Sequence, residues 1–444
     1  MAILHAVARS WSRARELAER TPETRNRYVD FLRAVSILVV VVGHWLMAAP
    51  FVKEGELSLS NDMLHVAPWT QWLTWGLQVM PLFFIVGGYS NAISWEAAQR
   101  SGAGYGPWIA GRLQRLVQPT VPLLAAWTLL AVVAHRLGAS PEMIRVGSQF
   151  ALIPTWFLAV YVMVVVVAPG THALWRRFGM SSFWALALGA VIVDAVGLAG
   201  GWPGMRWVNY AFVWLAVHHI GYLWKDGRLA GPARALPWAL AGLAVLIVLV
   251  TVASYPVSMI SVPGEEASNS RPPTIALLAL GAFHAGLVLA LEDRARRWLR
   301  RPRPWTATVL VNGTIMTLYL WHVTVLVLVV GLAYWLGGIG LGLAPNSAAW
   351  WATRPAWILL LLAMLLPFVA GFGRFEQRAR VRADAPAPAW QSVAGASAVC
   401  GGLTVLALGG IGAPGALGIR FWIVLLTFAG SALVAGGWLR GRAS

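Results

Sequence analysis

The residues with the clearest chemical potential lie in one apolar run, RYVDFLRAVSILVVVVGHWLM, at residues 27–47. Arg33 and His44 are eleven positions apart, which on an α-helix is about three turns and about 16 Å of rise, so the two side chains share one face. Asp30 stands three residues before Arg33 and can pair with it. Ionisable side chains inside a membrane span are costly and usually face a protein interior or a water-filled cavity. Asp30, Arg33 and His44 are therefore candidate functional residues.

This arrangement suits a proton transfer inside the membrane next to a fixed cation. Histidine is the commonest general base because its ordinary pKa lies near working pH. An arginine at the end of the helix suits a donor that carries phosphates. Spacing alone leaves a second interpretation open. In it, Arg33 extends to the membrane boundary and His44 is a hydrogen-bonded packing residue.

The composition identifies an integral membrane protein. The 444 residues are 58% hydrophobic and 11% charged, with a mean hydropathy of +0.66. A net charge of +17 would suggest nucleic acid in a soluble chain, but here membrane topology explains it, and we expect no nucleic-acid partner. The single cysteine, Cys400, excludes a disulfide framework and a thiolate metal site. No metalloprotease-like His/Glu spacing occurs, so we predict no metal.

Apolar runs of about 20 residues predict twelve transmembrane helices. Their centres lie near residues 40, 83, 126, 160, 190, 216, 246, 283, 322, 364, 402 and 428. Of the 34 Lys and Arg residues, 26 fall on the side of the N-terminus, seven on the other side and one, Arg33, inside the first span. Because basic residues concentrate in cytoplasmic loops, we expect both termini in the cytoplasm. The predicted fold class is thus an all-α polytopic membrane protein.

The chain divides into four predicted segments. Residues 1–26 form a basic cytosolic tail, which is either an amphipathic helix on a membrane face or a solvated segment. Residues 27–380 form the membrane domain, and residues 381–392 form an Ala/Pro linker. Residues 393–444 supply two more transmembrane helices and a short tail.

Four further stretches accompany Asp30-x-x-Arg33-x10-His44 in a fixed order. They are PLFFIVGGYSNAISW (81–95), Arg112-x-x-Arg115, TWFLAVYVMVVVVAP (155–169) and TLYLWHVTV (317–325). In this order the set resembles the motifs of acyltransferase family 3, which are integral membrane O-acyltransferases. The resemblance covers about residues 24–380, so the first ten predicted spans correspond to the family core and the last two lie outside it. Gly87, where the family often has serine, and Ile315-Met316, in place of a common Ser-Tyr, depart from the pattern.

The resemblance implies an activity. It implies transfer of an acyl group, often acetyl, from cytosolic acyl-CoA to a hydroxyl of a carbohydrate or lipid-linked envelope molecule. The Arg-rich and Ala/Gly-rich composition indicates a bacterium, so we expect the protein in a bacterial cytoplasmic membrane. His44 would take the proton from the attacking hydroxyl, with Arg33 and Asp30 beside it. The oligomeric state and the groups that stabilise the oxyanion are not predicted.

The resemblance also suggests residues that contact the two substrates. Arg112 and Arg115 would bind the phosphates of CoA, since a spacing of three lets one helix face present both. Plain anchoring of a cytosolic loop is the alternative for this pair. Further candidates for substrate contacts are His322, Tyr319 and Trp156.

Two other functional classes stay open. Twelve spans also suit a secondary transporter, and a glycolipid flippase without acyl-transfer chemistry would have a similar sequence. Transporters often contain internal repeats, whereas the second half of this chain shows no copy of the Arg33/His44 pattern. Incorporation of label from an acyl-CoA separates the classes, because a carrier leaves the thioester intact.

Overall fold

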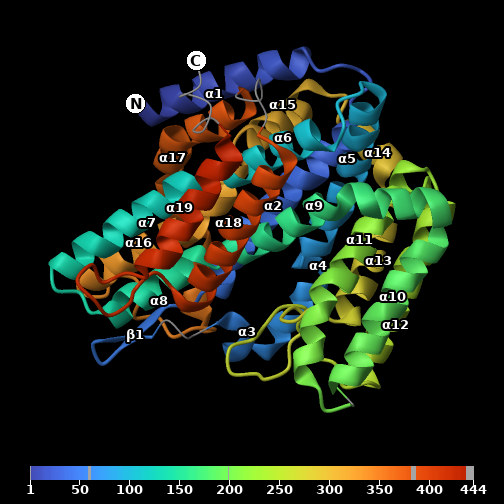
Figure 1. The fold of residues 1–444 in the computed structure, drawn as a ribbon. Helices are drawn as coiled ribbons and strands as arrows, with labels where there is room; N and C mark the ends of the chain where they lie inside the picture. Colours follow the sequence, from blue (N-terminus) through green and yellow to red (C-terminus); the bar gives the residue numbers. More distant parts are fainter. Residues whose placement is uncertain (1, 59–61, 199, 382–386, 437–444) are drawn as a thin grey trace.

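The computed structural model describes residues 2–58, 62–198, 200–381 and 387–436, and within these ranges the chain is mostly helical (Figure 1). Helices of the first part are α1 (Ala2–Glu19), α2 (Arg27–Met47), α3 (Met63–Val66), α4 (Thr74–Leu77), α5 (Met80–Arg100), α6 (Tyr105–Val117), α7 (Thr120–Arg136), α8 (Pro141–Leu152), α9 (Thr155–Phe178) and α10 (Met180–Leu198). The second part contains α11 (Asn209–Lys225), α12 (Pro232–Thr251), α13 (Ile275–Ala290), α14 (Glu292–Trp298), α15 (Pro302–Gly313), α16 (Ile315–Trp335), α17 (Ala348–Val381), α18 (Ala389–Gly409) and α19 (Phe421–Ala435).

The remaining elements are short. They are two 3-10 helices, η1 (Pro68–Leu73) and η2 (Pro203–Val208), and an antiparallel hairpin of β1 (Phe51–Lys53) and β2 (Glu56–Ser58). The hairpin is a small addition to the predicted all-α fold. It follows α2, at the opposite end of the bundle from α1 (Figure 1).

Nine helices of the described ranges are long and apolar enough to cross a membrane, and the bent pair of α13 and α14 raises the number to ten. A helix also covers each of the twelve predicted centres. However, α11 and α19 contain only 17 and 15 residues, which is shorter than the roughly 20 residues that a bilayer requires. The protein is thus a polytopic α-helical membrane protein.

The predicted N-terminal tail contains a long amphipathic helix. Helix α1 lies across one end of the bundle rather than along it (Figure 1), and it packs on α15. Ala14 and Ala18 are buried on its inner face, and the Trp305 indole donates a hydrogen bond to the Thr21 hydroxyl, 3.2 Å away, just after the helix ends. The contact with α15 fixes the segment to the bundle.

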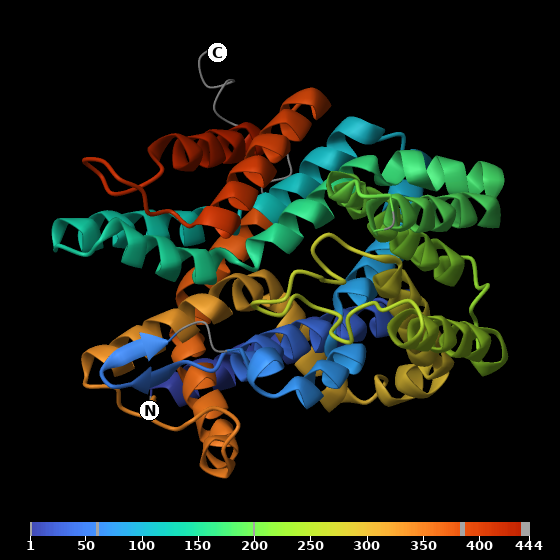
Figure 2. The same ribbon diagram turned by 90° about the horizontal axis from the view of Figure 1, so that it is seen from below.

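The last two helices pack directly on the core. Helix α18 contacts α6, α8 and α9 and pairs with α19, and both lie beside α7 and α8 in two views (Figures 1 and 2). Polar bonds reinforce the packing, since the backbone N–H of Ile411 donates to the Ser148 hydroxyl at 2.8 Å and the Gln118 amide donates to the Ser431 carbonyl at 3.1 Å. The predicted linker was too long, because α18 begins at Ala389, directly after Pro388; residues 382–386 lie outside the described ranges.

Glycines let three helix pairs approach closely. Small residues permit such backbone contact between membrane helices. A Cβ atom added at any of these six glycines would lie within 2.6 Å of a neighbouring backbone atom: Gly88 and Gly221 between α5 and α11, Gly242 and Gly286 between α12 and α13, and Gly395 and Gly430 between α18 and α19. The first crossing matters for function because α5 holds side chains of the candidate site.

Candidate active site

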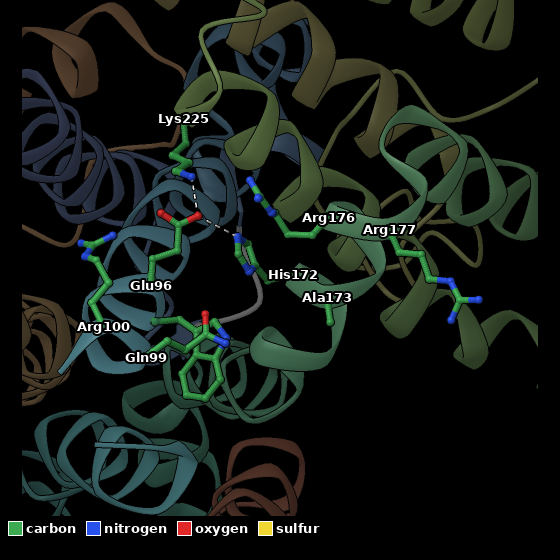
Figure 3. Close-up of a pocket in the computed structure, with 9 residues that line it drawn as sticks. Glu96, Gln99, Arg100, His172, Ala173, Arg176, Arg177 and Lys225 are labelled. Atoms are coloured by element: carbon green, nitrogen blue, oxygen red, sulfur yellow. Dashed lines mark hydrogen bonds and ion pairs between the residues drawn. The ribbon is translucent and has the colours of Figure 1, made fainter. Parts of the chain in front are cut away.

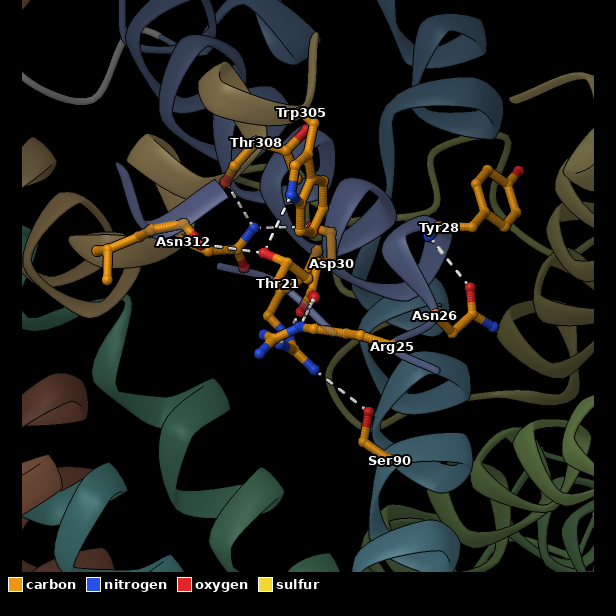
Figure 4. Close-up of polar contacts among 11 residues, drawn as sticks. Thr21, Arg25, Asn26, Tyr28, Asp30, Ser90, Trp305, Thr308 and Asn312 are labelled. Carbon is orange, nitrogen blue, oxygen red and sulfur yellow. Dashed lines mark hydrogen bonds and ion pairs between the residues drawn. The ribbon is translucent and has the colours of Figure 1, made fainter. Parts of the chain in front are cut away.

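Helix α2 begins at a network of polar side chains (Figure 4). The Asn26 side chain caps the helix by accepting from the backbone N–H of Tyr28 at 3.1 Å. In the first turn, the buried Asp30 carboxylate accepts from Arg25 at 2.6 Å and from Arg33 at 3.2 Å. A carboxylate there also complements the positive end of the helix dipole. The predicted Asp30–Arg33 pair is confirmed, and Arg25 joins it.

Arg33 and Arg112 meet at the same turn of α5. The Arg33 guanidinium donates to the Ser90 hydroxyl at 3.2 Å (Figure 4). Arg112, on α6, donates to the Ser90 carbonyl at 3.2 Å and also to the Ser94 hydroxyl. Two cations therefore converge on one polar stretch of an otherwise apolar helix. The sequence analysis missed the two serines, although hydroxyls four residues apart on one helix face were a visible signal.

Arg115 is placed differently from Arg112. Arg115 is exposed and makes no hydrogen bond or ion pair within the part of the chain that the structure describes. Arg112 is partly buried and also lies over the Trp108 ring, 5.2 Å from its centroid. Of the two predicted phosphate ligands, only Arg112 contacts the same turn as Arg33.

His44 and His322 form a hydrogen-bonded pair between α2 and α16. Nδ1 of His44 lies 2.8 Å from Nε2 of His322, and the two ring planes differ by only 3°. The indole of Trp45 donates to the His322 carbonyl at 2.9 Å, which joins the two helices at the same level. The structure thus brings together two candidates that are 278 residues apart in the sequence.

The hydrogen bonds determine which nitrogen of each neutral imidazole carries the proton. Nδ1 of His322 lies 2.7 Å from the Tyr319 carbonyl. A carbonyl only accepts, so this nitrogen must donate, and Nε2 of a neutral His322 is then an acceptor. It follows that Nδ1 of His44 donates to His322. Nε2 of His44 keeps its lone pair, and it has no partner among the described residues.

His44 is also the more exposed of the two rings. His322 is fully buried, with 0% of its surface exposed, whereas His44 is only partly buried. The free nitrogen of His44 can therefore meet a hydroxyl, while His322 orients His44 from behind. This order of carbonyl, histidine and histidine resembles the way in which a second group orients a catalytic base.

Tyr319 lies next to this pair, and Phe157 links Tyr319 to Trp156. The buried Tyr319 hydroxyl donates to the Pro154 carbonyl, so it is already engaged within the protein. The rings of Tyr319 and His322 lie 6.3 Å apart. Trp156 packs edge-on against Phe157 and is partly buried. Contacts of Tyr319 and Trp156 with a substrate stay a prediction.

Other intramembrane histidines lie outside this pair. His218, on α11, bonds to Asn91 on α5 at 3.1 Å, and Nδ1 of His219 bonds to the Leu215 carbonyl at 2.7 Å. Nε2 of His284 bonds to the Trp75 carbonyl at 2.9 Å. His218 therefore joins α11 to α5, His219 bonds within α11, and His284 joins α13 to the short helix α4.

Asp194, on α10, is a buried carboxylate with three polar partners. Its carboxylate accepts from the Asn209 amide at 2.8 Å, from the Tyr255 hydroxyl at 3.1 Å and from the backbone N–H of Ile275 at 2.9 Å. These partners connect α10 to α11 and to the start of α13. This carboxylate therefore has a structural role.

The fold and the site define a polytopic helical membrane protein with a paired-histidine centre inside its helical bundle. A family model described as an acyltransferase domain matches residues 26–372. The chain therefore belongs to acyltransferase family 3, and the protein is a membrane acyltransferase. The match ends within α17, before α18 and α19. Comparison with curated proteins and with solved structures gave no match.

Replacement of His322 tests its role as a positioning residue. His322→Phe removes the acceptor for Nδ1 of His44, so we expect kcat for acyl transfer to fall about a hundredfold with little change in KM, as when an orienting partner of a functional histidine is lost. His322→Gln restores an acceptor oxygen at a similar depth and should recover part of kcat. Wild-type values of kcat in both variants would show that His322 only fills space.

Proposed function

We propose that the protein transfers an acyl group, most simply acetyl, from cytosolic acyl-CoA to a hydroxyl of a carbohydrate or an envelope glycolipid. The observation that carries the proposal is Nε2 of His44, which has no partner among the described residues and which the bond to His322 leaves as a base. Family membership supports acyl transfer. The donor and the acceptor are our proposal.

The proposed reaction conserves atoms and charge. The acceptor oxygen attacks the thioester carbonyl as Nε2 of His44 takes the hydroxyl proton, so a C–O bond forms. The tetrahedral intermediate then collapses, the C–S bond breaks, and the CoA sulfur leaves with the proton that His44 returns. His322 accepts the hydrogen bond of His44 throughout and stabilises the transient imidazolium.

The position of the arginines suits the donor. Arg33 lies about 16 Å along α2 from His44, given the rise of a helix, and it meets Arg112 at Ser90. Guanidinium groups bind phosphates well, and an extended pantetheine arm would reach from them toward the histidine pair. We assign the diphosphate of CoA to Arg33 and Arg112, with Arg115 as an outer contact, and Asp30 as the residue that orients Arg33.

We propose a membrane arrangement that goes with this chemistry. All twelve helices at the predicted centres cross the cytoplasmic membrane of a bacterium. Both termini of the chain and the C-terminal ends of α5, α9 and α11 lie in the cytosol. The short helices α11 and α19 are then accommodated by local thinning of the bilayer. We keep the division of the chain into residues 1–26, 27–380 and 393–444. The linker between the last two segments ends earlier than residue 392, because α18 begins at Ala389.

Labelled acetyl-CoA provides the direct test. Membranes that contain the protein should move label from the thioester to an envelope acceptor in proportion to the amount of protein, and release free CoA at the same rate. Membranes from cells without the gene are the control. If label appears only as CoA-linked acetyl with every donor and acceptor, the reaction is not acyl transfer from CoA, and the transporter class gains weight.

A further inference from the structure

A second polar pocket lies where α5, α9 and α11 end together (Figure 3). It has a volume of about 760 Å³, within the range of small-molecule sites. Glu96 holds the walls together, since its carboxylate accepts from Lys225 at 2.5 Å and lies 3.2 Å from Nε2 of His172. Neither Arg112 nor Arg115 lines this pocket.

The pocket carries an excess of positive charge. Four basic residues line it, namely Arg100, Arg176, Arg177 and Lys225, and Glu96 is the one carboxylate among its lining residues. Within the described part of the chain, Arg100 and Arg176 form no side-chain hydrogen bond or ion pair, although Arg176 lies close enough to Glu96 to interact with its charge, and both are exposed. Arg176 extends toward His172, whereas the neighbouring Arg177 points away from the group (Figure 3). Two guanidinium groups are therefore available to an anion.

An aromatic wall completes the pocket and connects it to the candidate active site. Trp95 lines the pocket, and its ring lies 5.5 Å from the Trp108 ring. Trp108 in turn donates to the Ser94 hydroxyl at 3.1 Å, which also accepts from Arg112. Glu96 lies six residues beyond Ser90 on α5, or about 9 Å further along the helix axis and away from His44. A ligand in the pocket would thus lie next to the arginine pair.

We propose that this pocket binds the phosphorylated adenosine end of the CoA donor, an inference that rests on the proposed acyl-CoA chemistry. Arg100 and Arg176 take the 3′-phosphate of the adenosine, Lys225 adds charge, and Trp95 offers an aromatic face to the base. The diphosphate then lies at Arg112 and Arg33, and the pantetheine arm runs on from there toward His44. A ligand with both phosphates and an aromatic base matches the basic and the aromatic residues of the walls better than a simple phosphate or an uncharged aromatic ring.

A binding measurement tests the site without depending on turnover. Full-length protein in nanodiscs of phosphatidylcholine is titrated with adenosine 3′,5′-bisphosphate by calorimetry. We expect saturable binding that weakens about tenfold or more in the double variant Arg100→Gln/Arg176→Gln, because two charge-assisted contacts are lost. Arg294→Gln/Arg297→Gln is the matched control: it removes two exposed arginines of α14 that do not line the pocket, and it should leave affinity within about twofold.

A kinetic measurement then separates this inference from the proposed function. The double variant should raise KM for acetyl-CoA about tenfold and leave KM for S-acetylpantetheine, which lacks the nucleotide, unchanged. If the wild type transfers no acyl group but binds the nucleotide in a way that depends on Arg100 and Arg176, the proposed function alone is rejected. Normal acyl transfer with no change of affinity in the double variant would reject the site alone.

Two other results would overturn the assignment. Equal nucleotide affinity in all three proteins would mean that the arginines only anchor helix ends at the cytosolic face of the membrane, where basic residues concentrate. Phosphatidylglycerol that co-purifies with the wild type and is lost in the double variant, without saturable nucleotide binding, would assign the pocket to a lipid headgroup instead.

Discussion

His44→Ala lowers kcat for acyl transfer about a thousandfold, within the range for loss of a general base. The variant loses the only imidazole nitrogen of the pair that is free to take a proton. Donor binding should survive, because the arginines that we assign to the phosphates contact α5 and not the histidine pair. The expected signature is therefore a fall in kcat with KM for acetyl-CoA nearly constant.

The measurement is incorporation of radiolabelled acetyl in membranes, with the amount of each protein matched by immunoblot. His65→Ala is the control, since His65 is an exposed histidine in the short helix α3. Equal label in His44→Ala and wild type would mean that another group acts as the base. Loss of label in both histidine variants would point to a general effect on folding.

Local features of the site could be predicted from the sequence. Helical periodicity places Arg33 and His44 on one face, and a spacing of three allows the Asp30–Arg33 pair that the structure contains. These relations depend only on the geometry of a single helix. The positions of the membrane helices are predictable for a similar reason, because apolar length is read directly from the chain.

Contacts between helices could not be predicted in this way. His44 and His322 belong to α2 and α16, and only the packing of those helices brings Nδ1 of His44 to 2.8 Å from Nε2 of His322. The late TLYLWHVTV motif marked His322 as a candidate but gave no reason for it to contact His44. The side chain of Arg25 was missed as a partner of Asp30 because it lies before the helix begins.

The basic pocket escaped the sequence analysis for another reason. Its charges come from the ends of three helices, namely Glu96 and Arg100, His172 and Arg176, and Lys225. In the sequence, each basic residue follows an apolar run and looks like an ordinary cytosolic anchor. Only the convergence of these residues around Glu96 distinguishes a binding site from three unrelated helix ends at the membrane boundary.

Gly88→Val should prevent α5 from packing on α11. A Cβ atom at Gly88 would lie 2.0 Å from the His218 carbonyl oxygen, and the opposite glycine, Gly221, has equally little room against the Ile85 carbonyl at 2.2 Å. Because the obstructing atoms are backbone, a rotamer change cannot relieve the clash. The helices must separate, at a cost of about 3 kcal/mol or more in folding free energy, at or above the upper end of the usual range for overpacking.

The same separation should disturb the site, because α5 carries Ser90 and the Asn91 partner of His218. Fluorescence-detected size-exclusion chromatography after a heating series measures the melting temperature and the fraction of folded protein, and both should fall. Gly331→Val is the control, since a Cβ atom at Gly331 meets no atom within 4 Å, and its melting temperature should stay close to that of the wild type. A Gly88→Val protein that melts like the wild type would show that α5 and α11 do not cross at these glycines, and would remove the structural reason for Ser90 to lie beside Arg33 and Arg112.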